Sequence, residues 1–165
     1  KPFLSSFWAL PLGVLFVLFA VGVLRRLRGS RLALFSAGLI LVHGLASFAT
    51  GYFPCDQGCA PVQPSFSQQM HNLAGLVMFL SLTLASLLWA FASKRLMGAR
   101  GFGLFSLACT VLAVATVVLM AQAVETGHSF GLYQRINYGI SVIWVAGLAL
   151  MLSRSRAGAL QPGAT

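Results

Sequence analysis

The chain has 165 residues, of which 58% are hydrophobic and only 8% are charged, and its mean hydropathy is +0.88. A soluble domain needs far more charged side chains to cover its surface, so this composition excludes an ordinary soluble protein. The formal net charge of +9 would suit a nucleic-acid binder. That class is also excluded, because almost all the basic residues lie in short tracts between long apolar runs.

Five apolar segments are long enough to cross a bilayer as helices, since a hydrocarbon core of ~30 Å needs roughly 20 residues. In chain order they cover residues 7–24, 32–52, 69–92, 102–124 and 136–152. The sequence therefore predicts an all-α fold, an integral membrane helical bundle with five transmembrane helices. We expect one transmembrane domain over residues 1–165. Because the chain starts with Lys1 rather than methionine, we also expect that residues precede it in the complete protein.

Basic residues predict the orientation, because cytoplasmic loops are enriched in Lys and Arg. If the spans alternate, one side receives three basic tracts: Arg25, Arg26, Arg28 and Arg31, then Lys94, Arg95 and Arg100, then Arg154 and Arg156. The other side keeps only Lys1 and Arg135, together with both acids of the chain, Asp56 and Glu125. We therefore expect Lys1 outside and Thr165 in the cytoplasm.

The predicted outer loop at residues 51–68 reads GYFPCDQGCAPVQPSFSQ, which is too polar to span a bilayer. Cys55 and Cys59 flank Asp56 in this loop, and Gly58 permits a tight turn between them. In an oxidising compartment this spacing predicts a disulfide that fixes the direction of Asp56. A thiolate pair that binds a metal ion and two unpaired thiols are the alternatives.

Three short motifs together resemble a known family. They are GYFPCD at residues 51–56, MHNLA at 70–74, and GLYQRI at 131–136 before a last helix with Trp144. In this order they resemble the multi-pass bacterial membrane proteins catalogued as domain of unknown function 998, over most of the chain. The resemblance implies a compact helical bundle in the bacterial cytoplasmic membrane, with one more helix before the first segment here. It carries no established activity, and it points to Asp56, His71 and Arg135.

Polar residues near the predicted outer face, with one deeper histidine, form the candidate site. Asp56 lies fifteen positions before His71 and could orient its imidazole for catalysis or metal binding, or simply tie the loop to the helix. His43 lies ~16 Å below the end of the second span, where an ionisable residue suggests a function, although a hydrogen bond to a neighbouring helix is the alternative. Arg135 is expected to pair with Asp56 or Glu125. The predicted ligand pocket comprises His43, Ser47, Asp56, His71, Gln122, Glu125, Arg135 and Asn137.

Three functions stay open from the sequence. The first is a bundle that binds membrane lipid, another membrane protein or a second copy of itself at an outward-facing polar pocket. The second is a metal-dependent membrane hydrolase that uses His71 and Asp56, with zinc held by His71, His128, Asp56 and Glu125, although no HxxxH or HExxH pair is present. The third is a haem protein, which the different depths of His43 and His71 disfavour.

Overall fold

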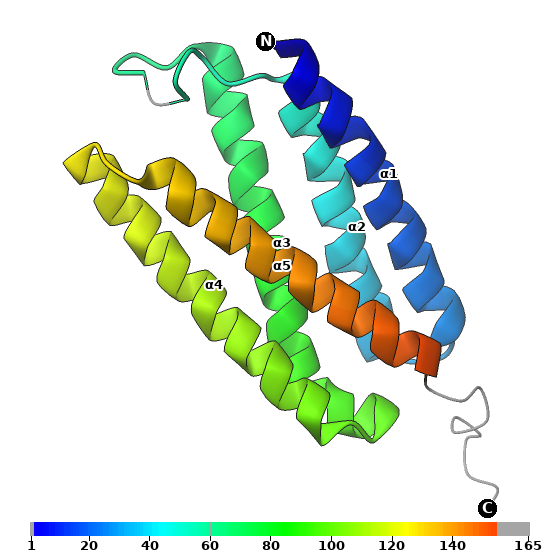
Figure 1. The fold of residues 1–165 in the computed structure, drawn as a ribbon. Helices are drawn as coiled ribbons and strands as arrows, with labels where there is room; N and C mark the ends of the chain where they lie inside the picture. Colours follow the sequence, from blue (N-terminus) through cyan, green and yellow to red (C-terminus); the bar gives the residue numbers. More distant parts are fainter. Residues whose placement is uncertain (1, 60, 155–165) are drawn as a thin grey trace, which may run out of the picture. The chain divides into compact units, whose positions relative to one another are not determined.

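The computed structural model of the protein describes residues 2–59 and 61–154, with their side chains from residue 9 onward (Figure 1). The described part is all-α and contains no strand. Its helices are α1 (Pro2–Arg26), α2 (Arg31–Tyr52), α3 (Phe66–Met97), α4 (Arg100–Thr126) and α5 (Phe130–Arg154). All five are long and apolar enough to cross a membrane. The predicted fold class, an all-α helical membrane bundle, is confirmed.

Each predicted apolar segment lies inside one of these helices, but the helices are longer than the segments. The helix α3 already begins at Phe66, ahead of the predicted start at residue 69, and α5 begins at Phe130, ahead of residue 136. The length of the bilayer core determines how many apolar residues a span needs. Backbone hydrogen bonding does not stop at that boundary, so polar residues continue each helix beyond it.

Short turns with glycine connect α1 to α2, α3 to α4 and α4 to α5, whereas a longer loop connects α2 to α3. Gly29 follows α1 with φ +86°, a left-handed conformation that costs glycine little. Ser30 then caps α2, because its Oγ accepts a hydrogen bond from the backbone N–H of Ala33 at 3.3 Å. At the end of α4, Gly127 takes a left-handed conformation with φ 73°. These local signals end one helix and begin the next.

The chain divides into two compact units, Lys1–Ala85 and Ser86–Thr165, and the division falls within α3. The first, called the amino-terminal unit here, contains α1, α2 and the first part of α3. The second, the carboxy-terminal unit, contains the rest of α3 with α4 and α5. A single domain over the whole chain stays a prediction.

In the amino-terminal unit, α1 and α2 pack closely along their length (Figure 1). A Cβ added to Gly44 would lie 3.0 Å from the carbonyl oxygen of Gly13, and one added to Gly13 would lie 2.9 Å from that of Gly44. Ser47 adds a hydrogen bond from its Oγ to the carbonyl oxygen of Ala9 at 3.3 Å. Membrane helices lack a hydrophobic force between them, so close contact of small residues is what holds such a pair together.

In the carboxy-terminal unit, polar side chains join the helices. Trp144 donates its Nε1–H to Ser106 Oγ at 3.0 Å. The hydroxyls of Ser86 and Thr110 are 2.8 Å apart. Asn137 belongs to the predicted ligand pocket, yet its Nδ2 donates to Thr116 Oγ1 at 2.8 Å and to the carbonyl oxygen of Ala113 at 2.9 Å. Its amide therefore ties α5 to α4.

Candidate functional site

His43 on α2 forms a hydrogen bond with α3. Its Nδ1 lies 2.9 Å from the carbonyl oxygen of Met78, and a carbonyl only accepts, so Nδ1 carries the hydrogen and donates. The side chain is only 2% exposed, and its ring centroid lies 4.3 Å from that of Phe16 on α1. Of the two interpretations from the sequence, the structure shows the hydrogen bond to a neighbouring helix.

The other ring nitrogen of His43, Nε2, is buried and has no hydrogen-bond partner among the described atoms. A second proton on this ring would place an unpaired charge in an apolar environment, at a large cost in free energy. The structure therefore holds an uncharged imidazole with its hydrogen on Nδ1.

His71 on α3 makes the converse hydrogen bond to α2. Its Nδ1 lies 2.9 Å from the carbonyl oxygen of Phe53, the residue that follows the last turn of α2. By the same reasoning, Nδ1 donates. One histidine thus donates from α2 to α3, and the other donates from α3 to α2. These two bonds are called the histidine pair here.

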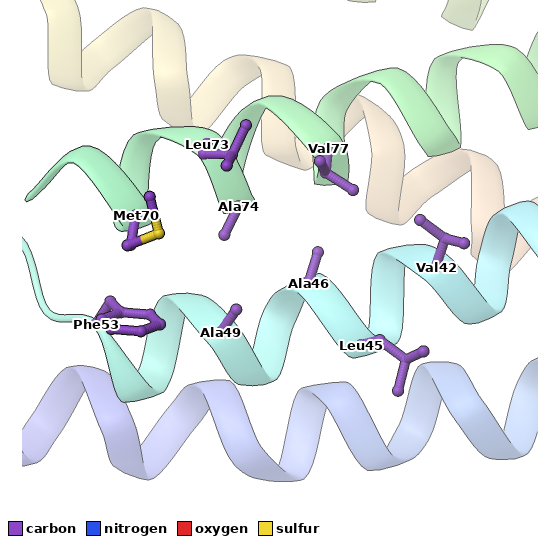
Figure 2. Close-up of a pocket in the computed structure, with 9 residues that line it drawn as sticks. All are labelled: Val42, Leu45, Ala46, Ala49, Phe53, Met70, Leu73, Ala74 and Val77. Carbon is purple, nitrogen blue, oxygen red and sulfur yellow. The ribbon is translucent and has the colours of Figure 1, made fainter. Parts of the chain in front are cut away.

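An apolar groove of about 320 Å³ lies between α2 and α3 (Figure 2). Its lining residues are Val42, Leu45, Ala46, Ala49, Phe53, Met70, Leu73, Ala74 and Val77. At one end Phe53 faces Met70, and at the other Val42 lies across from Val77, with alanines between (Figure 2). None of these side chains carries a polar nitrogen or oxygen.

The histidine pair brackets this groove. At the deep end, His43 and Met78 directly follow the lining residues Val42 and Val77 in the sequence. At the loop end, His71 follows Met70 and bonds to the carbonyl of Phe53, whose ring lines the groove. The helices are therefore tied together above and below a stretch where small side chains leave space between them.

The floor and the rims of the groove differ in exposure. Ala46 is 8% exposed and Ala74 is 7% exposed, whereas Leu45 and Leu73 are more than half exposed. The groove exists because the buried positions 46 and 74 are alanines, and larger side chains there would fill the space. Leu45 and Leu73 form the exposed rims of the groove.

The loop before α3 is built around Asp56. Its Oδ1 accepts from Ser65 Oγ at 2.6 Å, and its Oδ2 accepts from the Ser65 backbone N–H at 2.9 Å. In return, Gln68 Oε1 accepts from the backbone N–H of Asp56 at 2.8 Å. Hydrogen bonds from the Ser65 hydroxyl, and then from its backbone N–H, lower the pKa of Asp56. The carboxylate is therefore held in its charged form at the start of α3.

Cys55 and Cys59 form the predicted disulfide, with their Cα atoms 5.1 Å apart. The backbone N–H of Cys59 donates to the carbonyl oxygen of Asp56 at 2.9 Å, which closes the turn between the two cysteines. Gly58 and Cys59 both have positive φ, at 81° and 57°. Asp56 thus lies inside a small covalent ring, as the sequence predicted.

The expected Asp56–His71 pair is replaced by other partners. Both carboxylate oxygens of Asp56 accept from Ser65, and His71 donates to Phe53. Ser65 has this role because it caps α3: its Oγ also accepts from the backbone N–H of Gln68 at 3.1 Å. The sequence reasoning missed Gln68, which is 1% exposed. The capping-box pattern Ser-x-x-Gln at residues 65–68 was the signal that could have found it.

The remaining candidates lie in the carboxy-terminal unit. Gln122 and Glu125 are exposed near the end of α4. Arg135 donates from Nη1 to the carbonyl oxygen of Gly131 at 3.0 Å, and it forms no ion pair with Glu125 in the described part of the chain. His128 bonds through Nδ1 to the carbonyl oxygen of Thr126 at 2.7 Å. The predicted polar pocket draws four residues from each unit, so its assembly stays a prediction, as does an Arg135–Asp56 pair.

The predicted zinc ligands come from both units, His71 and Asp56 from the amino-terminal unit and His128 and Glu125 from the carboxy-terminal unit. Among the residues that the structure describes, no three His, Cys, Asp or Glu side chains form a group that could hold a metal ion. Both His43 and His71 use Nδ1 to bond a backbone carbonyl. The geometry gives no support to the hydrolase or the haem alternative.

The family model described as "Protein of unknown function (DUF998)" matches residues 1–151. The chain belongs to the DUF998 family. This membership confirms the resemblance drawn from the three motifs, and it brings no known activity with it. No curated protein and no solved structure matches this DUF998 protein.

The hydrogen bonds of Asp56 predict a pH-dependent stability. Because the folded pKa of Asp56 is lowered, its contribution is complete above the ordinary aspartate value, about 4, and is lost as the pH falls through the folded value. We expect Asp56→Asn to unfold at a lower temperature than the wild type at pH 7, and this difference to shrink as the solution is acidified. Thermal unfolding in detergent, followed by circular dichroism, measures it.

The control is Glu125→Gln, which changes an exposed acid in the carboxy-terminal unit. It should leave the unfolding temperature close to that of the wild type throughout the pH range. A difference between wild type and Asp56→Asn that stayed constant down to pH 3 would contradict the role of the ionised carboxylate.

Proposed function

We propose that this DUF998 protein is a non-catalytic membrane protein that binds a membrane lipid, with one acyl chain in the α2–α3 groove. The observation that carries the proposal is a groove of about 320 Å³ lined only by apolar side chains. Eight of its nine lining residues lie within Arg31–Tyr52 and Phe66–Met97, two helices that are long and apolar enough to cross a membrane.

The surroundings of the groove favour an acyl chain over a polar small molecule. Pockets for polar ligands present a few placed polar groups that fix the ligand, and this lining has none. At membrane depth the molecules that surround α2 and α3 are lipid tails rather than water. An acyl chain is thus both the chemically matched ligand and the most abundant one.

The size of the groove favours a lipid over a partner helix. A helix with its side chains is ~10–12 Å across, too thick to enter a hollow whose floor is Ala46, Ala49 and Ala74. An acyl chain is an unbranched row of methylene groups, much thinner than a helix, and it can lie between the rims formed by Leu45 and Leu73. A partner protein or a second copy would instead contact only the rims.

Acyl-chain binding alone would give little selectivity. A lipid tail that moves from the bilayer into the groove leaves no water behind, so the hydrophobic effect does not favour the transfer. Retention depends on dispersion contacts with the groove and on interactions of the headgroup at its end. The polar residues at the end of the groove therefore bear on which lipid is bound.

Filling the groove tests the proposal. Ala49→Phe places a ring in the hollow, so we expect purified protein to retain less lipid, by about half or more if this is the main site. Native mass spectrometry, or quantification of extracted lipid per protein, measures the change. Gly38→Phe on the same helix is the matched control, because an added Cβ there meets no heavy atom within 4 Å.

Equal lipid retention by wild type and Ala49→Phe would show that the groove is not the binding site. Loss of self-association in Ala49→Phe, with lipid retention unchanged, would instead assign the groove to a second copy of the chain.

We also propose that the protein lies in the bacterial cytoplasmic membrane, with the Cys55–Cys59 loop outside and Arg154 in the cytoplasm. The support is the distribution of basic side chains: Arg25, Arg28 and Arg31 are exposed at the α1–α2 turn, whereas the loop with the disulfide has no Lys or Arg. A disulfide also suits an oxidising compartment.

Reporter fusions test this orientation. Green fluorescent protein, which folds only in the cytoplasm, should fluoresce when fused after Thr165, and alkaline phosphatase fused after Gln63 should be active. An inactive phosphatase fusion together with a fluorescent fusion at the same loop position would reverse the orientation.

A further inference from the structure

The two ends of α2 differ in charge. Arg31 begins α2, Arg25 and Arg26 end α1, and Arg28 lies in the connection between the two helices. No Lys or Arg occurs between Arg31 and Lys94, although this stretch includes the whole loop before α3. The loop end instead carries Asp56. With 22 residues, α2 separates these two ends by ~33 Å.

His71 offers a free acceptor at the loop end of the groove. Its Nδ1–H is used by the carbonyl oxygen of Phe53, and Nε2 has no hydrogen bond among the described residues. In a neutral imidazole whose Nδ1 carries the hydrogen, Nε2 has a lone pair and can only accept. Met70, next to His71 in the sequence, and Phe53 both line the groove, so this acceptor lies beside its end.

The nearest acidic residue to His71 in the sequence is Asp56, which is joined to α3 through Gln68. Gln68 lies three residues before His71 on α3, and its Oε1 holds the backbone N–H of Asp56 at 2.8 Å. Residues three apart on a helix share a face, so Asp56 is tied to α3 one turn above His71. The charged residue of the loop at this end is therefore Asp56, whose carboxylate also accepts two hydrogen bonds from Ser65, and the loop has no Lys or Arg that would repel a cation.

We infer that the lipid of the proposed groove presents a primary ammonium headgroup at the loop end, where His71 Nε2 accepts an ammonium N–H and Asp56 supplies the opposite charge. This inference rests on the proposed lipid site and adds the class of headgroup to it. The acyl chain then extends from Phe53 and Met70 toward Val42 and Val77.

This chemistry distinguishes three common headgroups. Ethanolamine has both a positive charge and N–H donors. Choline has a positive charge but no N–H, so it cannot bond to Nε2. Glycerol has hydroxyl donors, but its phospholipid carries a net negative charge, which Asp56 disfavours in a loop without Lys or Arg. Phosphatidylethanolamine should therefore be enriched over the other two.

The experiment uses the full chain in nanodiscs that contain equal amounts of phosphatidylethanolamine, phosphatidylcholine and phosphatidylglycerol with identical acyl chains, at pH 8. Lipid that stays bound after transfer to detergent is quantified by native mass spectrometry. We expect the wild type to retain about threefold more phosphatidylethanolamine than either competitor, the ratio for one hydrogen bond of average strength in a membrane protein.

The variant His71→Asn separates headgroup recognition from folding. Its side-chain amide can take the place of Nδ1–H toward the Phe53 carbonyl, but it has no atom at the position of Nε2. We expect the preference for phosphatidylethanolamine to disappear while the total bound lipid stays the same. His128→Asn, at an exposed histidine of the other unit, should keep the preference.

Equal retention of phosphatidylethanolamine and phosphatidylcholine by the wild type would overturn the inference, as would an unchanged preference in His71→Asn. Either outcome can be distinguished from a failure of the proposed lipid site, because the Ala49→Phe variant tests that site separately. If the lipid site itself is wrong, Ala49→Phe leaves total lipid retention unchanged, whatever the headgroup.

Discussion

The need to satisfy buried polar groups without water is the constraint on which the amino-terminal unit depends. His43 is 2% exposed within a helix suited to span a membrane, and its Nδ1–H must find an acceptor there. The carbonyl oxygen of Met78 provides it at 2.9 Å. Because His71 makes the converse bond at the loop end, α2 and α3 are fixed at two heights, and the groove occupies the interval between them.

Two further features hold the groove in place. Behind it, α1 and α2 are already in close contact at Gly13 and Gly44, so α2 has little room to shift toward α1 and away from α3. At its end, the Cys55–Cys59 bridge and the bonds among Asp56, Ser65 and Gln68 fix where the loop joins α3. The apolar hollow is thus framed by polar and covalent contacts, and this division allows selectivity to reside at the end of the groove.

The sequence predicted the five apolar helices well, because span length and hydropathy are properties of single segments. It also predicted the disulfide, whose two cysteines are four residues apart. Contacts between segments were harder to predict. The expected Asp56–His71 pair failed because a nearby serine cap competed for the carboxylate. The groove could not be foreseen, because it arises where alanines at positions 46, 49 and 74 face each other across two helices whose register the sequence does not reveal.

Solid-state ¹⁵N nuclear magnetic resonance in bilayers at pH 8 measures directly which ring nitrogen of each histidine carries the hydrogen. We expect His43 and His71 both to carry their hydrogen on Nδ1 and to leave Nε2 unprotonated, with each signal assigned by comparison with a single-histidine variant. Protonation at Nε2 instead of Nδ1 in either residue would contradict this expectation, because that ring could not donate to the carbonyl that ties α2 to α3.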